Sequence, residues 1–286
     1  MIEKIILGTV QLGLNYGVNN TSGLPSKTDV HNILAIAQEH GITQLDTAAA
    51  YGEAENRIGE FHSQASIKFD INTKFEKENN FDWNISLKQS ITRTEVSRLH
   101  TIMFHSFESY LNKKNEIPDF WDRGRNILFD KIGVSAYTNE ELEKLLDDDF
   151  ISVVQFPFNL LDNNYQRGAI LNRLKDNGKE VHTRSCFLQG LFFVEENSIP
   201  VKLRPLAPYI KEISSIASSN NLEIGHLALQ YCLQNKLIDG VLIGLEKPEQ
   251  LIQNINWSLS RLDESILNQI DALVVPNIEL LNPSKW

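Results

Sequence analysis

The sequence predicts an α/β protein built as one (β/α)8 barrel, a single domain over residues 1–286. Two observations carry this prediction. Short runs of β-forming apolar residues alternate with longer amphipathic stretches along the whole chain, which indicates repeated βαβ units. No segment rich in Pro, Gly and Ser divides the chain, and its 42% hydrophobic content is enough for one large core.

Eight strand-like runs follow one another along the chain. They are Ile5–Leu7, Thr43–Thr47, Asp70–Lys74, His100–His105, Lys131–Ser135, Ser152–Phe156, Glu180–Cys186 and Gly240–Ile243. Eight right-handed βαβ units close into a TIM barrel, whose active site lies at the carboxyl ends of the strands. An open doubly wound sheet is the alternative, but the glycines of Gly8–Gly13 have the wrong spacing for a dinucleotide-binding Gly-x-Gly-x-x-Gly motif.

Helical spacing is clear between these runs. Leu142, Leu145 and Leu146 keep the i, i+3, i+4 rhythm over 139–146, and a second helix-like stretch covers 29–40. Side chains that can accept hydrogen bonds from the first amides of a helix stand at Thr28-Asp29, Thr138-Asn139 and Asp263. Helices are therefore expected to begin at these three places.

Composition excludes several classes of function. The formal net charge is −10 and no basic cluster exceeds Lys113-Lys114, so no nucleic-acid partner is expected. No apolar run approaches the ~20 residues that span a bilayer, and we expect no signal peptide before the first strand. Cys186 and Cys232 lie in apolar segments without metal-ligand spacing. We expect a cytoplasmic protein with no metal and no membrane contact.

Three polar residues end strand-like runs, and a fourth lies in a loop that follows one of them. Asp46, Lys74 and His105 stand at strand ends, and Tyr51 comes five residues after Asp46. Taken singly, such a tyrosine or histidine is more often structural, and a strand-end aspartate often caps a turn. In a barrel, however, these ends converge on one mouth. The four side chains are therefore expected to meet.

The four residue types suit the protonation of a carbonyl oxygen. A free tyrosine has a pKa near ~10, too high for efficient proton donation at neutral pH. The ammonium of Lys74 beside the phenol of Tyr51 would lower that pKa, and the carboxylate of Asp46 would keep the lysine charged. His105 would hydrogen-bond the carbonyl oxygen and orient it toward the phenol.

The segment 45–59, with its Asp-Thr-Ala followed by Tyr-Gly, resembles the signature loop of the aldo-keto reductases. Thr73-Lys74-Phe75 and Met103-Phe104-His105-Ser106 are similar to the lysine and histidine strands of that family, and further similarity runs in family order to 248–254. The resemblance implies an NAD(P)H-dependent reductase of aldehydes or ketones. It implies four catalytic residues, Asp46, Tyr51, Lys74 and His105.

The resemblance also implies a site for the nicotinamide cofactor. Ser135 and Gln155 would hold the carboxamide, although Ala136 replaces an asparagine that the family usually has. Arg184 replaces a common tyrosine, and its guanidinium either stacks on the nicotinamide or turns outward to a carboxylate. The implied cofactor-binding residues are Gly8, Thr9, Ser135, Gln155, Arg184, Ser185, Phe187, Gln189, Gly190, Gly244, Glu246, Lys247, Gln250 and Asn254.

The choice between NADPH and NADH depends on the start of the last strand-to-helix connection. Gly244 and Leu245 replace a Lys-Ser pair of NADPH-selective members, and Gln250 replaces an arginine. Glu246 would repel a 2′-phosphate and accept hydrogen bonds from a free ribose hydroxyl, whereas Lys247 would attract the phosphate. Because the family favours NADPH, we expect NADPH by a small margin over NADH.

Substrate recognition is expected from the loop 13–20, which follows the first strand, and from aromatic side chains around the mouth. The expected residues are Tyr16, Phe107, Phe158 and Trp286, although such aromatics more often pack in a core or hinge. Asn and Gln near an apolar wall favour a sugar or sugar derivative. The chain also resembles family members from bacterial carbohydrate and surface-polysaccharide gene clusters.

Two other functions are compatible with the same scaffold. The first is a non-catalytic, nicotinamide-binding regulatory subunit, which the presence of all four catalytic residue types disfavours. The second is an aldolase that forms a Schiff base at Lys74. A carboxylate partner would keep Lys74 protonated and make it a poor nucleophile, so carbonyl reduction is the preferred hypothesis.

Overall fold

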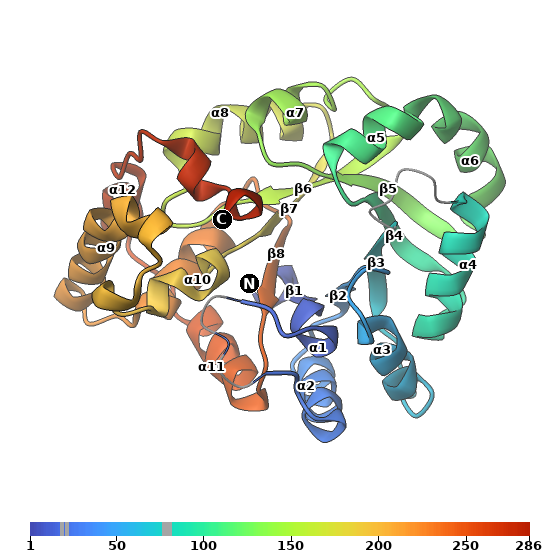
Figure 1. The fold of residues 1–286 in the computed structure, drawn as a ribbon, viewed down its shortest axis with the longest axis horizontal. Helices are drawn as coiled ribbons and strands as arrows, with labels where there is room; N and C mark the ends of the chain where they lie inside the picture. Colours follow the sequence, from blue (N-terminus) through green and yellow to red (C-terminus); the bar gives the residue numbers. More distant parts are fainter. Residues whose placement is uncertain (18–19, 21–22, 76–81) are drawn as a thin grey trace.

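The computed structural model describes residues 1–17, 20, 23–75 and 82–286, and its strands form one closed parallel barrel. Strand order follows the sequence, and β8 pairs with β1 to close the barrel (Figure 1). The strands are β1 (Ile5–Gly8), β2 (Gln44–Asp46), β3 (Asp70–Lys74), β4 (Leu99–Phe104), β5 (Phe129–Ser135), β6 (Ile151–Pro157), β7 (Glu180–Arg184) and β8 (Gly240–Gly244). The predicted (β/α)8 barrel is confirmed, and the open sheet is wrong.

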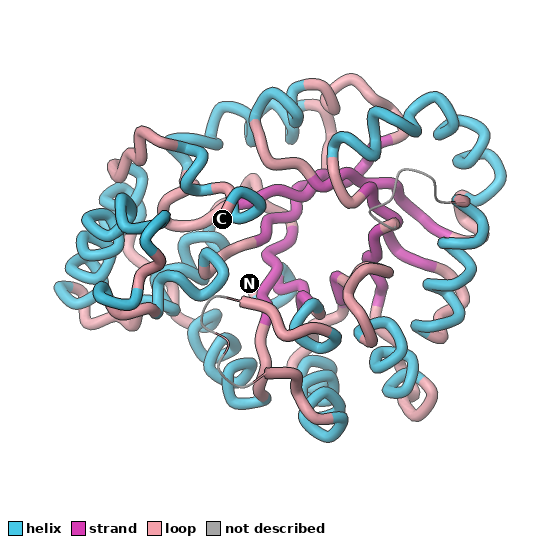
Figure 2. Tube along the Cα trace, viewed as in Figure 1, coloured by secondary structure: helices cyan, strands magenta, loops and turns pink. Residues whose placement is uncertain are grey.

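Helices surround the strands on the outside of the barrel (Figure 2). The α-helices are α1 (Val10–Gly13), α2 (Lys27–Glu39), α3 (Ala54–His62), α4 (Trp83–Thr94), α5 (Phe107–Lys113), α6 (Ile117–Gly124), α7 (Asn139–Glu143), α8 (Asn164–Asp176), α9 (Ala207–Ser219), α10 (Ile224–Gln234), α11 (Pro248–Leu259) and α12 (Glu264–Asp271). Short 3₁₀ segments are η1 (Ile2–Lys4), η2 (Lys114–Glu116), η3 (Leu188–Phe193), η4 (Glu196–Ser198), η5 (Val201–Leu206), η6 (Ile278–Leu281) and η7 (Pro283–Lys285). Within the described ranges, no helix is long and apolar enough to cross a membrane.

The core fills the space between this ring of helices and the barrel wall. Ile33 and Leu34 of α2 and Leu87 of α4 are fully buried, as are Leu45 of β2 and Ile71 of β3. Strands covered by helices on their outer face are expected to carry such apolar residues almost continuously. The strands therefore hold a fixed register, and the register sets where each strand-end side chain lies.

The structure corrects several predicted element ends. The cap of α2 is Ser26, two residues before Thr28, and its Oγ accepts from the Asp29 amide at 3.1 Å. Thr138 caps α7 as predicted, whereas Asp263 stands at the N-cap of α12 without a side-chain hydrogen bond. Strand β7 ends two residues earlier than predicted, because Ser185 has a φ of +62° and turns the chain.

Charged side chains pair with one another at the amino ends of the strands. Glu180, the first residue of β7, accepts hydrogen bonds from Lys131 of β5 and from His182 at 2.9 Å. Burial opposes ionisation of Glu180, but the hydrogen bond and charge of His182, and then those of Lys131, outweigh it and lower the pKa of Glu180 to about 2. Gly240 makes room for this group, because a Cβ there would lie 2.8 Å from the His182 ring.

Candidate active site

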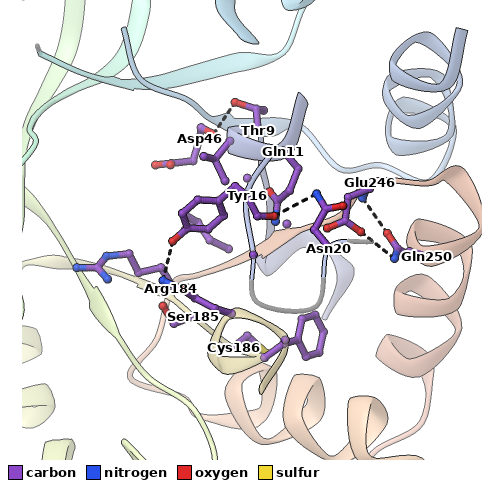
Figure 3. A pocket seen from close by; sticks show the side chains of 18 of the residues that line it. Thr9, Gln11, Tyr16, Asn20, Asp46, Arg184, Ser185, Cys186, Glu246 and Gln250 are labelled. Carbon is purple, nitrogen blue, oxygen red and sulfur yellow. Dashed lines mark hydrogen bonds between the residues drawn. The ribbon is translucent and has the colours of Figure 1, made fainter. Parts of the chain in front are cut away.

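A pocket opens at the carboxyl ends of the strands, where a barrel places its active site (Figure 3). The lining residues come mainly from β1 and the segments that follow β1, β2, β7 and β8. They are Gly8, Thr9, Val10, Gln11, Tyr16, Gly17, Asn20, Asp46, Tyr51, Gln155, Arg184, Ser185, Cys186, Phe187, Gln189, Gly190, Phe193, Leu242, Gly244, Glu246 and Gln250.

A buried ion pair lies at the floor of this pocket. Asp46 and Lys74 end β2 and β3, and their side chains are 4% and 3% exposed. Lys74 Nζ donates to Asp46 Oδ1 and, at 3.2 Å, to the carbonyl of Thr47, while Gln155 Nε2 donates to Asp46 Oδ2 at 2.8 Å. Burial lowers the pKa of Lys74, but Asp46 and Tyr51 outweigh burial and leave that pKa above its ordinary value. The amine is therefore charged.

Tyr51 lies next to this ion pair, in the loop between β2 and α3. Lys74 Nζ is 5.4 Å from the centre of the phenol ring. The ring of His105, which directly follows β4, stands at 89° to the Tyr51 ring with 6.1 Å between centroids. The structure thus brings together the four side chains that the sequence placed at strand ends and in the loop after β2.

The pKa of Tyr51 differs from the sequence-based expectation. Burial has the largest effect and raises this pKa above its usual value, while the charges of Lys74 and Arg184 lower it only in part. Lys74 lowers the pKa as expected, but removal of the phenol from water outweighs the nearby ammonium and leaves the pKa of Tyr51 raised. The phenol therefore carries its proton at neutral pH.

Two glycines fix the backbone around Tyr51. Gly13 ends α1 so close to the Tyr51 loop that a Cβ there would lie 1.8 Å from the Tyr51 carbonyl oxygen. Gly52 has a φ of +55°, and a Cβ on it would lie 2.6 Å from the Gly13 carbonyl oxygen. The main chains of these two loops therefore touch directly, and their contact sets the position of the phenol.

The segment after β7 forms one wall of the pocket in an unusual backbone conformation. Ser185, Leu188 and Gln189 have φ values of +62°, +48° and +53°, which side-chain-bearing residues adopt at a cost of about 1–3 kcal/mol each. Such conformations cluster at ligand sites. Gln189 Nε2 donates to the Tyr16 hydroxyl at 2.8 Å, which links this wall to the loop after β1. Val18 and Asn19 of that loop lie outside the described residues.

Arg184, at the end of β7, lies across the pocket from the start of α11 (Figure 3). Its guanidinium lies 4.1 Å from the centre of the Tyr137 ring, and Nη2 donates to the Ala136 carbonyl at 3.1 Å. The alternative in which Arg184 turns outward to a carboxylate is wrong, because the side chain packs on β5-end residues and lines the pocket.

Glu246 and Gln250 mark the opposite end of the pocket. Gln250 Oε1 accepts from the Glu246 amide at 2.8 Å, and Gln250 Nε2 donates to Glu246 Oε2 at 3.0 Å (Figure 3). Lys247 is exposed at the N-cap of α11 and does not line the pocket. The sequence did not decide whether Glu246 or Lys247 faces the cofactor site, and in the structure Glu246 lines the pocket.

Comparison with known proteins agrees with this arrangement. The aldo/keto reductase family matches residues 4–275. The chain belongs to the aldo/keto reductase family. It is 23% identical over 305 residues to the aldo-keto reductase YhdN of Bacillus subtilis, covering 94% of this chain and 89% of that protein. It is 31% identical over 123 residues to L-galactose dehydrogenase of Arabidopsis thaliana, a match that covers 40% of this chain and only 38% of that protein.

Solved reductases share the fold. The holo form of an aldo-keto reductase from Bacillus halodurans superposes with a TM-score of 0.71 at 17% identity, covering 96% of this chain and 94% of the other. An aldo-keto reductase from a deep-sea metagenome library gives 0.67 at 18% identity, with coverages of 94% and 90%. Family membership implies reduction of a carbonyl with a nicotinamide cofactor.

The residues of this reductase fit such a cofactor. Gln155 Oε1 is buried without a hydrogen-bond partner among the described residues, and it borders the pocket next to Asp46. A nicotinamide carboxamide would supply the missing donor. Ser135 lies beside Gln155 in the β5–β6 register and is 4% exposed. Gly8 and Gly244, paired across β1 and β8, leave the pocket wall free of side chains.

Some residues predicted for the reductase site lie elsewhere. Phe158 is fully buried and stacks on Tyr231 at 5.4 Å between centroids, so it is a core residue. Phe107 begins α5 and packs against Tyr110. Trp286 donates its Nε1 to the Leu280 carbonyl at 3.0 Å. Neither these three aromatics nor Asn254, which is 4% exposed within α11, line the pocket.

Five lining residues were missed from the sequence: Val10, Gln11, Cys186, Phe193 and Leu242. Gln11 is the most informative, because its Oε1 is buried without a partner in the described part of the chain. A Cβ on Gly244 would meet the Gln11 side chain at 2.5 Å, so the glycine leaves space for this amide. Gln11 follows the end of β1 by three residues, and this position alone predicts a side chain at the mouth of the barrel.

Proposed function

We propose that this aldo-keto reductase reduces an aldehyde or ketone to an alcohol, with Tyr51 as the general acid. The observation that carries the proposal is the arrangement of the phenol beside the buried Lys74–Asp46 ion pair and the His105 ring, at the pocket that Asp46 and Tyr51 line. The bound nicotinamide cofactor supplies the hydride. A carbonyl oxygen that enters between Tyr51 and His105 meets a proton donor on one side and a hydrogen-bonding ring on the other.

Each member of the group has a separate task in this proposal. The phenol of Tyr51 donates its proton as the carbonyl oxygen becomes an alkoxide, and the charge of Lys74 favours this transfer by opposing the rise in the Tyr51 pKa that burial causes. The ammonium of Lys74 then stabilises the phenolate that the transfer leaves behind. Asp46 and the carbonyl of Thr47 hold Lys74 in position, and Gln155 holds Asp46. His105 orients the carbonyl oxygen toward the phenol.

We infer that NADH is used at least as well as NADPH. This proposal replaces the slight preference for NADPH that was expected from the sequence. Glu246 lines the pocket and Lys247 does not. A carboxylate at the pocket wall repels a 2′-phosphate and accepts hydrogen bonds from a free ribose hydroxyl. The amide of Gln250, which replaces an arginine, offers no positive charge to offset Glu246.

The test of the proposed reaction is cofactor oxidation. Purified protein is mixed with NADH or NADPH and a panel of aldehydes, ketones and keto-sugars, and the loss of reduced-cofactor absorbance is followed. Turnover that disappears in Tyr51→Phe supports the assignment, and absence of turnover with every carbonyl contradicts it.

Borohydride trapping tests the aldolase alternative, which the charged state of Lys74 disfavours. A Schiff base would leave a covalent adduct on the protein.

A further inference from the structure

Arg184 brings a positive charge to the pocket without a negative charge to balance it. Of the five N–H donors of the guanidinium, one donates to the neutral carbonyl of Ala136, and the plane stacks on Tyr137. Among the described residues, no carboxylate forms an ion pair with Arg184. The side chain is half-buried, so water replaces the missing partner only in part.

A second arginine, Arg167, has hydrogen-bond partners for all three nitrogens of its guanidinium. Arg167 of α8 donates from Nε and Nη2 to Asp162 at 2.6 and 2.8 Å, from Nη1 to Asn139 at 2.7 Å, and from Nη2 to the carbonyl of Tyr137 at 2.8 Å. That arginine is fully engaged by the protein and serves the structure. Arg184 borders the pocket, but among the described residues it makes a single hydrogen bond, to the carbonyl of Ala136.

The carboxylates around Arg184 are matched by other groups or lie away from it. Asp162, on which the charge of Arg184 also acts, is ion-paired with Arg167. The carboxylate of Asp46 is neutralised by Lys74 and hydrogen-bonded by Gln155. Tyr16 and Gln189 contribute a hydroxyl and an amide, both neutral. The acidic Glu246 lies at the opposite end of the pocket (Figure 3). Arg184 also acts on Tyr51 through its charge, which places it within electrostatic reach of the proton donor.

We propose that Arg184 binds an anionic oxygen group of the carbonyl substrate, so that the preferred substrate is an acidic aldehyde or ketone carrying a carboxylate or phosphate. This inference rests on the proposed function and names its substrate class. The planar guanidinium can grip such a group with two parallel hydrogen bonds. Phosphates of the cofactor are the other source of the same chemistry. Arg184 lines the same pocket as Tyr51, at the end opposite Glu246, and this position favours the substrate (Figure 3).

The kinetic test compares matched pairs of acidic and neutral substrates. Glucuronate is compared with glucose, 4-carboxybenzaldehyde with benzaldehyde, and glyceraldehyde 3-phosphate with glyceraldehyde. The wild type should show a higher kcat/KM for the acidic member. Arg184→Met should lower that acidic-to-neutral ratio about 10- to 100-fold, with most of the loss in KM, and Arg184→Lys should retain part of it. Arg173→Met, on the outer face of α8, is the control and should leave the ratio unchanged.

A binding experiment separates this proposal from the proposed reaction and from the cofactor. Benzoate binding to the protein is measured by calorimetry, and NADH binding by fluorescence, in wild type and both Arg184 variants. Loss of benzoate binding with NADH affinity unchanged supports the proposal, even if no carbonyl were reduced. An unchanged acidic-to-neutral ratio together with weakened NADH binding would overturn it and assign Arg184 to the cofactor. Thermal melting checks that both variants fold. If Arg184→Met does not fold, the same comparison is made between wild type and Arg184→Lys.

Discussion

The two ends of the barrel deal with their polar groups in opposite ways, and strand β7 takes part in both. Its residues 180, 182 and 184 alternate along the strand and so share one face. At the amino end, Glu180 and His182 pair with each other and with Lys131. At the carboxyl end, among the described residues, Arg184 has no carboxylate partner and makes one hydrogen bond, to the Ala136 carbonyl. The Oε1 atoms of Gln155 and Gln11 have no hydrogen-bond partner there.

This difference separates stability from function within one fold. Polar groups that the protein satisfies by itself stabilise the folded state, and their removal should affect unfolding more than turnover. Polar groups that the protein leaves without partners are available to ligands, and their removal should affect turnover or binding more than unfolding. Substitutions at the two ends of the barrel can therefore be used to test the comparison directly.

The largest expected effect is at Tyr51. Tyr51→Phe removes the proton that is to be donated and should lower kcat by on the order of 10²–10⁴, with the affinity for NADH and the melting temperature nearly unchanged. The measurements are cofactor oxidation and fluorescence titration. Tyr165→Phe, at an exposed position of α8, is the matched control. Reduction at wild-type speed in Tyr51→Phe would remove the tyrosine from the mechanism.

A smaller loss, with a diagnostic pH dependence, is expected at Lys74. Lys74→Met should lower kcat about 10- to 1000-fold, because the phenolate loses its cation. The positive charge of Lys74 lowers the pKa of Tyr51, so its removal raises that pKa further. Reduction requires the protonated phenol, and the alkaline fall in rate should therefore move to higher pH. Asp46→Asn should lower kcat by less, and because the charge of Asp46 raises the pKa of Tyr51, the alkaline fall in rate should not move to higher pH in that variant. An unshifted pH profile in Lys74→Met would contradict the assignment.

At the amino end the expected effect is on stability. Glu180→Gln should lower the free energy of unfolding by about 1–3 kcal/mol at neutral pH, because it breaks charged hydrogen bonds to His182 and Lys131. The folded pKa of Glu180, about 2, is depressed below its ordinary 4.5, so the stabilisation is present above pH 4.5 and is lost as pH falls toward 2. Denaturant unfolding at several pH values measures the difference, and kcat/KM should stay near wild type.

The smallest effect is expected for cofactor choice. Glu246→Ser should shift the kcat/KM ratio toward NADPH by about five- to tenfold, since a carboxylate at the pocket wall no longer faces the 2′-phosphate. Lys247→Ala should change the ratio less, because Lys247 is exposed and does not line the pocket. A larger shift in Lys247→Ala than in Glu246→Ser would mean that the ribose lies nearer the lysine.

Sequence patterns predicted the barrel and the meeting of its strand-end residues for a clear physical reason. Parallel register carries the last residue of each strand to one mouth, so Asp46, Lys74 and His105 had to approach one another once the strands were identified. Side-chain direction outside regular elements was not predictable in this way. Glu246 and Lys247 are adjacent in the sequence, and only the hydrogen bonds of Gln250 to the Glu246 backbone and carboxylate decide which one lines the pocket.

Other misses came from effects that depend on three-dimensional packing. Phe158 follows β6 by one residue, and burial against Tyr231 of α10 removes it from the mouth. The direction of the Tyr51 pKa shift depends on how completely the phenol is withdrawn from water, a quantity that sequence spacing does not contain. Ser26 and Thr28 are both suitable helix caps by residue type, and only the structure shows that α2 begins after Ser26.

The contact of Gly13 with the Tyr51 loop bears on how this protein can change over evolution. The two segments meet through main-chain atoms and not through side chains, since neither Gly13 nor Gly52 has room for a Cβ. Side chains elsewhere in the loop after β1, such as Tyr16 and Asn20, can therefore be exchanged without displacing the proton donor. Selection can vary which molecules are accepted while the chemical step is inherited intact, and a library restricted to that loop should yield altered specificity with few inactive clones.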